Sequence, residues 1–159
     1  MQIQITAVGK LKEDYLREGI AEYLKRLTTL AKVKIVEVAD EKLPQGDAEA
    51  LLNIAKEAEG ERLLAALPKN HYHIVLDMRG KNLSSVDLAR LIEDLALSGK
   101  SQLAFTIGGS AGLSKKVVDT ADFILSFGNM TYPHQLMRLM LLEQIYRSLK
   151  INRGEQYHK

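Results

Sequence analysis

The sequence predicts an α/β fold in which helices cover both faces of a mostly parallel β-sheet. Its hydrophobic pattern alternates between the two-residue repeat of strands and the 3.6-residue repeat of helices, and this alternation recurs five times. Two of the expected strands, residues 73–77 and 103–107, are almost entirely apolar, which is typical of strands buried on both faces. The chain has 159 residues with no linker or internal repeat, so we expect one domain over residues 1–159.

Each expected element has its own local pattern. Strands are predicted where short runs are apolar or alternate apolar with polar residues, at residues 3–8, 33–38, 73–77, 103–107 and 123–125. Helices are predicted where apolar residues recur at i, i+3 and i+4, at residues 14–27, 47–67, 84–99 and 133–150, with a short helix from about residue 114.

Turn-forming and capping residues set several of the boundaries. The turn at residues 44–47 ends in Asp47, which can cap the helix that follows it. Ser84 and Asp87 have the spacing of a capping box. Pro133 opens the last helix, because proline is tolerated at the first helical position.

The composition excludes several classes of site. There is no cysteine, so disulfide scaffolds, cysteine-ligated zinc, iron–sulfur clusters and thiol nucleophiles are ruled out. His71 and His73 lack the spacing of a zinc motif, so we expect no metal, and Ser110 lacks the flanking residues of a hydrolase nucleophile. The longest apolar run has five residues, against roughly 20 needed to span a bilayer. We see no signal peptide and expect a cytoplasmic protein without membrane contact.

The charge is small overall but unevenly distributed. The net charge is +2, whereas residues 130–159 carry five bases against two acids. One interpretation is an ordinary basic helix C-terminus, and the other is a local contact with a polyanion. Charge alone favours the ordinary C-terminus.

Ligands of open parallel sheets bind beyond the carboxyl ends of the strands. Three such ends carry candidate residues here, at residues 76–80, 107–112 and 126–132, and residues 79–81 are expected to close the first of these strands. Residues 108–112 read GGSAG, which lacks the glycine spacing of a dinucleotide fingerprint and the Lys-Ser/Thr ending of a P-loop. NAD and ATP are therefore poorly supported. Taken alone, this run fits a tight turn about as well as a nucleoside-type cofactor.

The last expected helix is apolar around its whole circumference, which is typical of a helix buried on all sides. In a chain of this length we expect one face to pack on the sheet and another on a second copy, giving a homodimer with two-fold symmetry. The alternative is a helix enclosed entirely by its own domain.

The C-terminal tail, expected at residues 150–159, brings together three chemically useful side chains. Arg153 offers a guanidinium for phosphate, Tyr157 a ring that can stack on a base, and His158 an imidazole that can move a proton. Composition alone favours the competing interpretation of a disordered tail.

Six short motifs along the chain occur together in one known family. They are AVGK at residues 7–10, LDMRGK at 76–81, IGGS at 107–110, FGNMTYPHQ at 127–135, EQIYR at 143–147 and YHK at 157–159. On these motifs the chain resembles the ribosomal RNA large subunit methyltransferase H family, within the SPOUT superfamily. The resemblance covers essentially the whole chain, and the combination of the last three motifs is specific.

The resemblance implies an α/β fold with a trefoil knot in its C-terminal part, and a homodimer. It implies methyl transfer from S-adenosylmethionine (AdoMet) to N3 of a pseudouridine in the large-subunit (23S) ribosomal RNA, without a metal. By the family pattern AdoMet is held at the three strand ends, by Leu76, Gly108, Phe127, Gly128, Asn129, Met130, Thr131 and Tyr132.

The chemistry of this reaction gives the remaining residues their expected roles. N3 must lose its proton before it attacks, and His158 is the candidate base because an imidazole titrates near neutral pH. Tyr157 is expected to position the base, and Arg153 to contact phosphate or carbonyl groups. Arg138 and His134 are expected to contact the substrate, which we take to be an assembled ribosomal surface.

Two other functions stay open on the sequence alone. One is a SPOUT methyltransferase that acts on tRNA, and the other is a non-catalytic ribosome-binding protein with the same fold. AdoMet binding would exclude the second, and the choice among tRNA, rRNA and whole ribosomes would decide the first.

Overall fold

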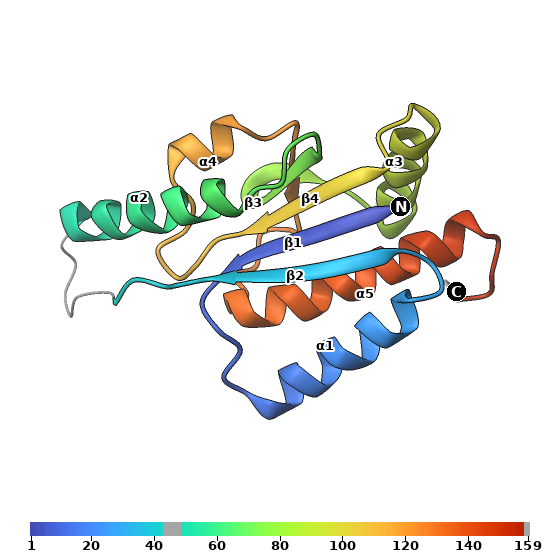
Figure 1. Ribbon diagram of the computed structural model, residues 1–159, viewed down its shortest axis with the longest axis horizontal. Helices are drawn as coiled ribbons and strands as arrows, with labels where there is room; N and C mark the ends of the chain where they lie inside the picture. The colour runs from blue at the N-terminus through green and yellow to red at the C-terminus, as the bar shows by residue number, and fades with distance from the viewer. Residues whose placement is uncertain (43–48, 158–159) are drawn as a thin grey trace.

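Five parallel strands form one sheet in the computed structural model, which describes residues 1–42 and 49–157 (Figure 1). The strands are β1 (Gln2–Val8), β2 (Lys32–Val38), β3 (Tyr72–Asn82), β4 (Gln102–Ile107) and β5 (Phe123–Ser126). They lie in the order β2-β1-β4-β3-β5, and each neighbouring pair runs parallel. The predicted α/β class with a parallel sheet is therefore confirmed.

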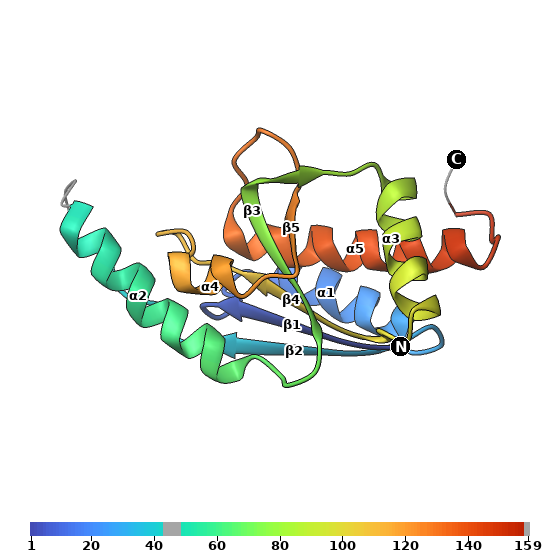
Figure 2. The same cartoon turned by 90° about the horizontal axis from the view of Figure 1, so that it is seen from above.

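The helices cover both faces of this sheet. They are α1 (Asp14–Leu27), α2 (Glu49–Ala66), α3 (Ser85–Leu97), α4 (Lys115–Asp119) and α5 (His134–Asn152). Figure 2 shows α1, α3 and α5 on one face and α2 and α4 on the other. Apart from the start of α2, which was predicted at a residue outside the described ones, the predicted boundaries lie within two residues of the observed ones except at the end of β3. No helix in the described part of the chain has the length and apolar character needed to cross a membrane.

The two faces of the sheet bury different sets of side chains, because successive residues of a strand point to opposite sides. Ile74 and Leu76 of β3 join the larger core, which α1, α3 and α5 complete, whereas Val75 joins the smaller core beneath α2 and α4. Burying a side chain of this size stabilises a fold by roughly 1.5–3 kcal/mol. The sheet therefore gives a rigid base to the loops at its carboxyl edge.

β3 is longer than the sequence predicts. Residues 79–81 do not close the strand, which continues to Asn82 and pairs with β5 again after a register shift. The close crossing depends on Gly80, because a Cβ there would lie 2.6 Å from the carbonyl carbon and oxygen of Ile124. Tertiary pairing thus makes a strand of a polar run with little strand propensity of its own. The trefoil knot that the resemblance implies stays a prediction.

Of the two predicted helix caps, Ser84 and Asp47, the structure describes only Ser84. Oγ of Ser84 accepts a hydrogen bond from the N–H of Asp87 at 3.1 Å, so the predicted cap of α3 is confirmed. The described part of α2 begins at Glu49. The turn at residues 44–47 and its cap Asp47 lie outside the described residues.

α5 is anchored by Arg138, the largest side chain that the fold buries completely. Its guanidinium donates to Oε1 of Glu37 at 2.7 Å and to the carbonyl oxygens of Val8 and Gly9, each at 2.6 Å. These bonds tie α5 to the carboxyl ends of β1 and β2. A buried cation needs such partners, since desolvating an unpaired charge is costly.

Candidate cofactor site

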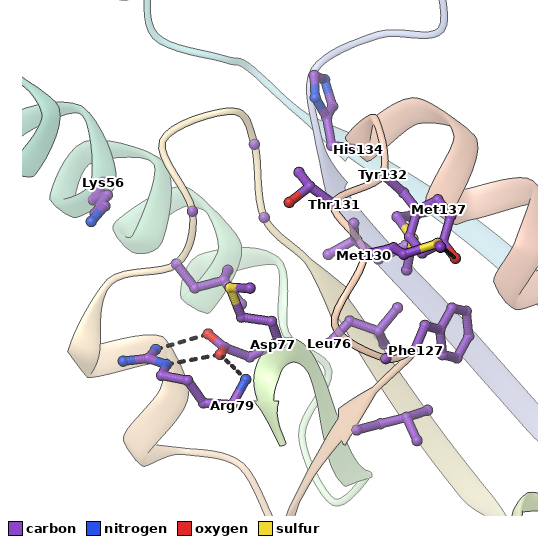
Figure 3. Close-up of a pocket in the computed structure, with 18 residues that line it drawn as sticks. Lys56, Leu76, Asp77, Arg79, Phe127, Met130, Thr131, Tyr132, His134 and Met137 are labelled. Atoms are coloured by element: carbon purple, nitrogen blue, oxygen red, sulfur yellow. Dashed lines mark hydrogen bonds and ion pairs between the residues drawn. The ribbon is translucent and has the colours of Figure 1, made fainter. Parts of the chain in front are cut away.

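The carboxyl ends of β3, β4 and β5 meet around one cavity of about 390 Å³, which we call the strand-end cavity (Figure 3). These are the three strand ends at which the sequence predicts a ligand. Its volume falls within the range of small-molecule sites, roughly 300–1,000 Å³. Lys56 of α2 and two residues of α5, His134 and Met137, complete the lining.

Most residues that the resemblance assigns to AdoMet line this cavity. They are Leu76, Gly108, Phe127, Gly128, Met130, Thr131 and Tyr132. Asn129, the eighth, is exposed and is not among the lining residues. The structure therefore brings these residues together, while their contact with AdoMet stays a prediction.

The glycine loop, residues 108–112, contributes a wall made of backbone. The N–H of Gly112 donates to the carbonyl of Gly109 at 3.0 Å, which closes a tight turn. A Cβ at Gly108 would lie 2.9 Å from Cγ of Leu113, so this position excludes a side chain. Gly108, Gly109 and Gly112 line the cavity without side chains, so the peptide groups of the loop can exchange hydrogen bonds with a ligand.

A second wall comes from residues 127–132, which join β5 to α5. Oγ of Ser126 accepts a hydrogen bond from the N–H of Gly128 at 3.1 Å, and Gly128 adopts a φ of +103°, which favours glycine. Phe127 lines the cavity after this turn, and Met130 is 73% exposed at its edge. Apolar side chains beside a backbone wall suit a flat heteroaromatic ring.

The sequence does not single out the charged residues of the cavity. Asp77 and Arg79 form a bidentate pair, in which Nε and NH2 of the guanidinium donate to the two carboxylate oxygens, each at 2.8 Å (Figure 3). The guanidinium lowers the pKa of the Asp77 carboxyl, which stays ionised. Strand alternation places both residues on one side of β3, and this is the signal that could have found them. Within residues 1–42 and 49–157, no three His, Asp or Glu side chains gather to hold a metal ion.

His134 is the first residue of α5, since Pro133 occupies the cap position and not the first helical one. Its Nδ1 lies 3.4 Å from Oγ of Ser110 in the glycine loop. Burial and the nearby charge of Arg138 lower the pKa of the imidazole, and Asp40 opposes this. The ring is therefore neutral at pH 7 and lies at the cavity, where a substrate contact was expected of it.

Arg138 does not lie where a substrate contact requires it. It is 0% exposed and its guanidinium is bonded inside the fold, so the protomer does not present it to a substrate. Two further bases of the C-terminal region are paired within the chain, Arg147 with Glu143 and Lys150 with Glu155. The ordinary basic C-terminus is therefore the better interpretation of the charge pattern.

The described part of the tail packs on the protein's own helices. The rings of Tyr157 and Tyr146 pack edge to face, with their centres 4.9 Å apart. The guanidinium of Arg147 lies 4.8 Å from the centre of the Tyr157 ring. Arg153 is exposed and donates to the carbonyl of Thr29 at 3.3 Å. Residues 153 and 157 of the tail thus have contacts within the protomer.

The tail and the strand-end cavity lie at opposite ends of α5. The helix has 19 residues, and a rise of 1.5 Å per residue makes it about 28 Å long. His134 lines the cavity at its first turn, and the tail follows its last residue, Asn152. The protomer therefore does not bring Tyr157 or Arg153 to the cavity. His158 lies outside the described residues.

α5 also borders a second hollow of about 510 Å³, which we call the α5 hollow. Leu141 and Leu142 point into the protein's own core, whereas Leu139 and Met140 are only partly buried and line the hollow. Phe127 lines both the hollow and the strand-end cavity. The apolar circumference of the helix thus divides between a covered face and a partly open one.

Comparison with known sequences finds relatives along the whole chain. The family model described as "Predicted SPOUT methyltransferase" matches residues 1–158. A protein named ribosomal RNA large subunit methyltransferase H from Carboxydothermus hydrogenoformans is 57% identical over 159 residues, which is 100% of both chains. The protein of the same name from Enterococcus faecalis is 53% identical over the same extent.

Solved structures share the fold at much lower identity. A probable methyltransferase from Bordetella pertussis superposes with a TM-score of 0.56 at 16% identity, covering 92% of this chain and 95% of that one. A tRNA (m1G37) methyltransferase from Aquifex aeolicus gives 0.51 at 13% identity, covering 92% and 70%. At such identities the likeness describes the fold alone.

Proposed function

Because this chain belongs to the ribosomal RNA large subunit methyltransferase H family of the SPOUT methyltransferases, we propose that it transfers a methyl group from AdoMet to N3 of a pseudouridine in 23S ribosomal RNA. One observation carries the proposal beyond the family. Three strand ends converge on a single cavity, and seven of the eight residues assigned to AdoMet line it. Open parallel sheets bind their cofactors where the carboxyl ends of several strands meet at one edge.

The residues around the strand-end cavity fit AdoMet chemically. The backbone of the glycine loop supplies hydrogen-bonding groups for the edge of a purine. Leu76 and Phe127 supply apolar surface for its ring. Asp77 and Arg79 add a polar ion pair to the lining, with both carboxylate oxygens already bonded to the guanidinium.

The protein's contribution to the reaction is alignment and proton removal. When bound, AdoMet supplies a methyl group that its sulfonium makes electrophilic. Displacement at carbon needs the reacting atoms about 3–3.5 Å apart and in line, so the cavity walls act mainly by holding both partners. His158 is our candidate acceptor for the N3 proton, since an unperturbed imidazole has a pKa of about 6.5. His134, neutral at the cavity, is our candidate for a hydrogen bond to the substrate.

The tail can act at a strand-end cavity only if a second copy brings it there. Within one protomer Tyr157 folds back onto the middle of α5, where its ring packs on Tyr146 and its hydroxyl donates to Oε1 of Glu143 at 3.3 Å. Tyr146 is still about 18 Å of helix away from His134. The α5 hollow offers a partly open apolar face for such a copy. We therefore infer a two-fold homodimer in which the tail of one protomer completes the cavity of the other.

The substrate we propose is the assembled ribosome, which also places the enzyme in the bacterial cytoplasm. The sequence contains no added RNA-binding motif, and its net charge is only +2. Binding of free RNA depends strongly on excess positive charge. Recognition by shape on a folded ribosomal surface places less demand on charge.

The direct test is a methylation assay with labelled AdoMet on ribosomes from a strain that lacks the enzyme. We expect label in 23S rRNA, and nucleoside analysis should place it on N3 of a pseudouridine. Free tRNA and free rRNA are tested as alternative substrates, and ribosomes from the parent strain are the control. Label in tRNA alone would indicate the other SPOUT activity, and AdoMet binding without any transfer would indicate a non-catalytic protein.

A further inference from the structure

A buried carboxyl lies directly behind the glycine loop and is not part of the cavity lining. Glu59 of α2 is 3% exposed, and its Oε1 accepts a hydrogen bond from the backbone N–H of Glu41 at 2.9 Å. Its Oε2 is buried without a hydrogen-bond partner among the described residues. Burying a carboxyl costs free energy, so a position that retains one calls for a physical reason.

The carboxyl of Glu59 is packed against the backbone of the glycine loop. A Cβ at Gly109 would lie 2.9 Å from Oε2 of Glu59 and 2.9 Å from Cγ1 of Val8. The side of Gly109 on which a Cβ would lie is therefore filled by Val8 of β1 and Glu59 of α2. The next residue of α2, Gly60, brings the helix close to the start of α4, because a Cβ there would collide with Oγ of its cap residue Ser114.

We propose that Glu59 is a positioning residue for the cofactor, which braces the backbone of Gly109 and so keeps the glycine loop in the shape that binds AdoMet. This inference rests on the proposed function. Glu59 acts through the reach of its side chain and through its bond to the N–H of Glu41, since its Oε2 forms no ion pair among the described residues. Supporting residues of this kind set how well a site is preorganised.

Two conservative variants separate reach from charge. Glu59→Gln keeps the length of the side chain and an oxygen that can accept from Glu41, but removes the charge. Glu59→Asp keeps the charge but withdraws the carboxyl from Gly109 by one methylene. Glu61→Asp, two residues further along α2 at an exposed position, is the matched control.

The first readout is the Kd of AdoMet, measured by calorimetry on the full chain. We expect Glu59→Gln and Glu61→Asp to bind like the wild type, and Glu59→Asp to bind about tenfold more weakly, which is ~1.4 kcal/mol. Gly109→Ala should weaken binding as well, and combining it with Glu59→Asp should add little, because both changes disturb one contact. Wild-type affinity in Glu59→Asp, or weak binding in Glu59→Gln with normal binding in Glu59→Asp, would overturn the proposal.

The second readout needs no ligand and separates this inference from the proposed function. Amide hydrogen exchange of residues 108–113 in the free protein should be faster in Glu59→Asp than in the wild type, and unchanged in Glu61→Asp. Equal exchange in all three proteins would refute the bracing role. Failure of the wild-type chain to bind AdoMet would instead refute the proposed function. The exchange measurement would still show whether Glu59 braces the glycine loop.

Discussion

At the scale of single residues, the strand-end cavity is shaped by places where a side chain is missing. Gly108, Gly109 and Gly80 each lie so close to other atoms that a Cβ would collide with them. Gly109 and Gly80 mark close approaches of segments that lie far apart in the sequence, whereas Gly108 lies against Leu113 of the same turn. Glu59 and Arg138 are the counterpart, because each is a charged residue whose position makes sense only through the backbone it contacts.

Gly108→Val tests the backbone wall. Its side chain would meet Leu113, and its β-branch would restrict the local backbone. We expect the variant to lose the thermal shift that AdoMet gives the wild type, where ligand at 100 times its Kd adds about 2.7 kcal/mol of stability. Ala111→Val, in the same loop but outside the cavity lining, should keep the shift. An undiminished shift in Gly108→Val would show that the wall does not contact AdoMet.

Glu59→Gln tests the titration of the buried carboxyl. Burial raises the pKa of Glu59 above its ordinary 4.5, the charges of Asp40 and Glu41 act in the same direction, and the N–H of Glu41 and the charge of Arg62 oppose it. The folded state thus holds the proton more tightly than the unfolded chain, so the wild type loses stability as pH rises from about 4.5 towards the raised pKa. Urea unfolding should show the variant gaining on the wild type over this window. A difference that does not change with pH would contradict the assignment.

At the scale of elements, the periodicity of the sequence was enough to predict the strands and helices but not all of their contacts. Repeats of two and 3.6 residues place the elements because they report which residues face a core. The extension of β3 beyond residue 79 has no such pattern, since it exists only through pairing with β5. Gly60 within α2 was a readable hint, because a glycine inside a helix of good helix formers often marks a close approach.

Tyr157→Ala tests how α5 holds the tail. It removes the edge-to-face contact with Tyr146 and the contact with Arg147. We expect a loss of roughly 1–2.5 kcal/mol in the free energy of unfolding, from one aromatic pair and one partly exposed cation–π contact. Tyr157→Phe should retain most of this stability, and Tyr15→Ala, at a 63% exposed position, should cost little. Equal stability of Tyr157→Ala and the wild type would mean that the tail is not held.

At the scale of the whole molecule, the sequence predicted the position of the cavity but not where the C-terminal tail lies relative to it. The strand ends could be found because parallel sheets gather them at one edge, and the motifs supplied the residues. Chain order does not show where a tail packs, and the protomer holds Tyr157 against Tyr146, about 18 Å of helix away from His134. Arg138 shows the same limit, because a basic residue on an apolar helix looks the same in sequence whether it faces RNA or the carbonyls at the end of β1.

Met140→Glu tests the homodimer. Met140 lines the α5 hollow, and a carboxylate there would be desolvated at an apolar contact. Light scattering of the wild type should give twice the 17.8 kDa chain mass, and the variant should give the mass of a single chain. Leu97→Glu, at an 82% exposed position, should remain a dimer. A monomeric wild type with full activity would refute both the dimer and the shared cavity.

The place of β1 in the sheet has a consequence for synthesis. β1 leaves the ribosome before the other four strands of the sheet, yet it lies between β2 and β4 and pairs Gln2 with Gln102. At about 5–20 residues per second, this partner arrives roughly 5–20 s later. In that interval one edge of β1 is open to wrong partners, so chains stalled before β4 should be digested by protease far more readily than chains stalled after α5. A protein proposed to modify finished ribosomes is thus most open to proteolysis while a ribosome is still synthesising it.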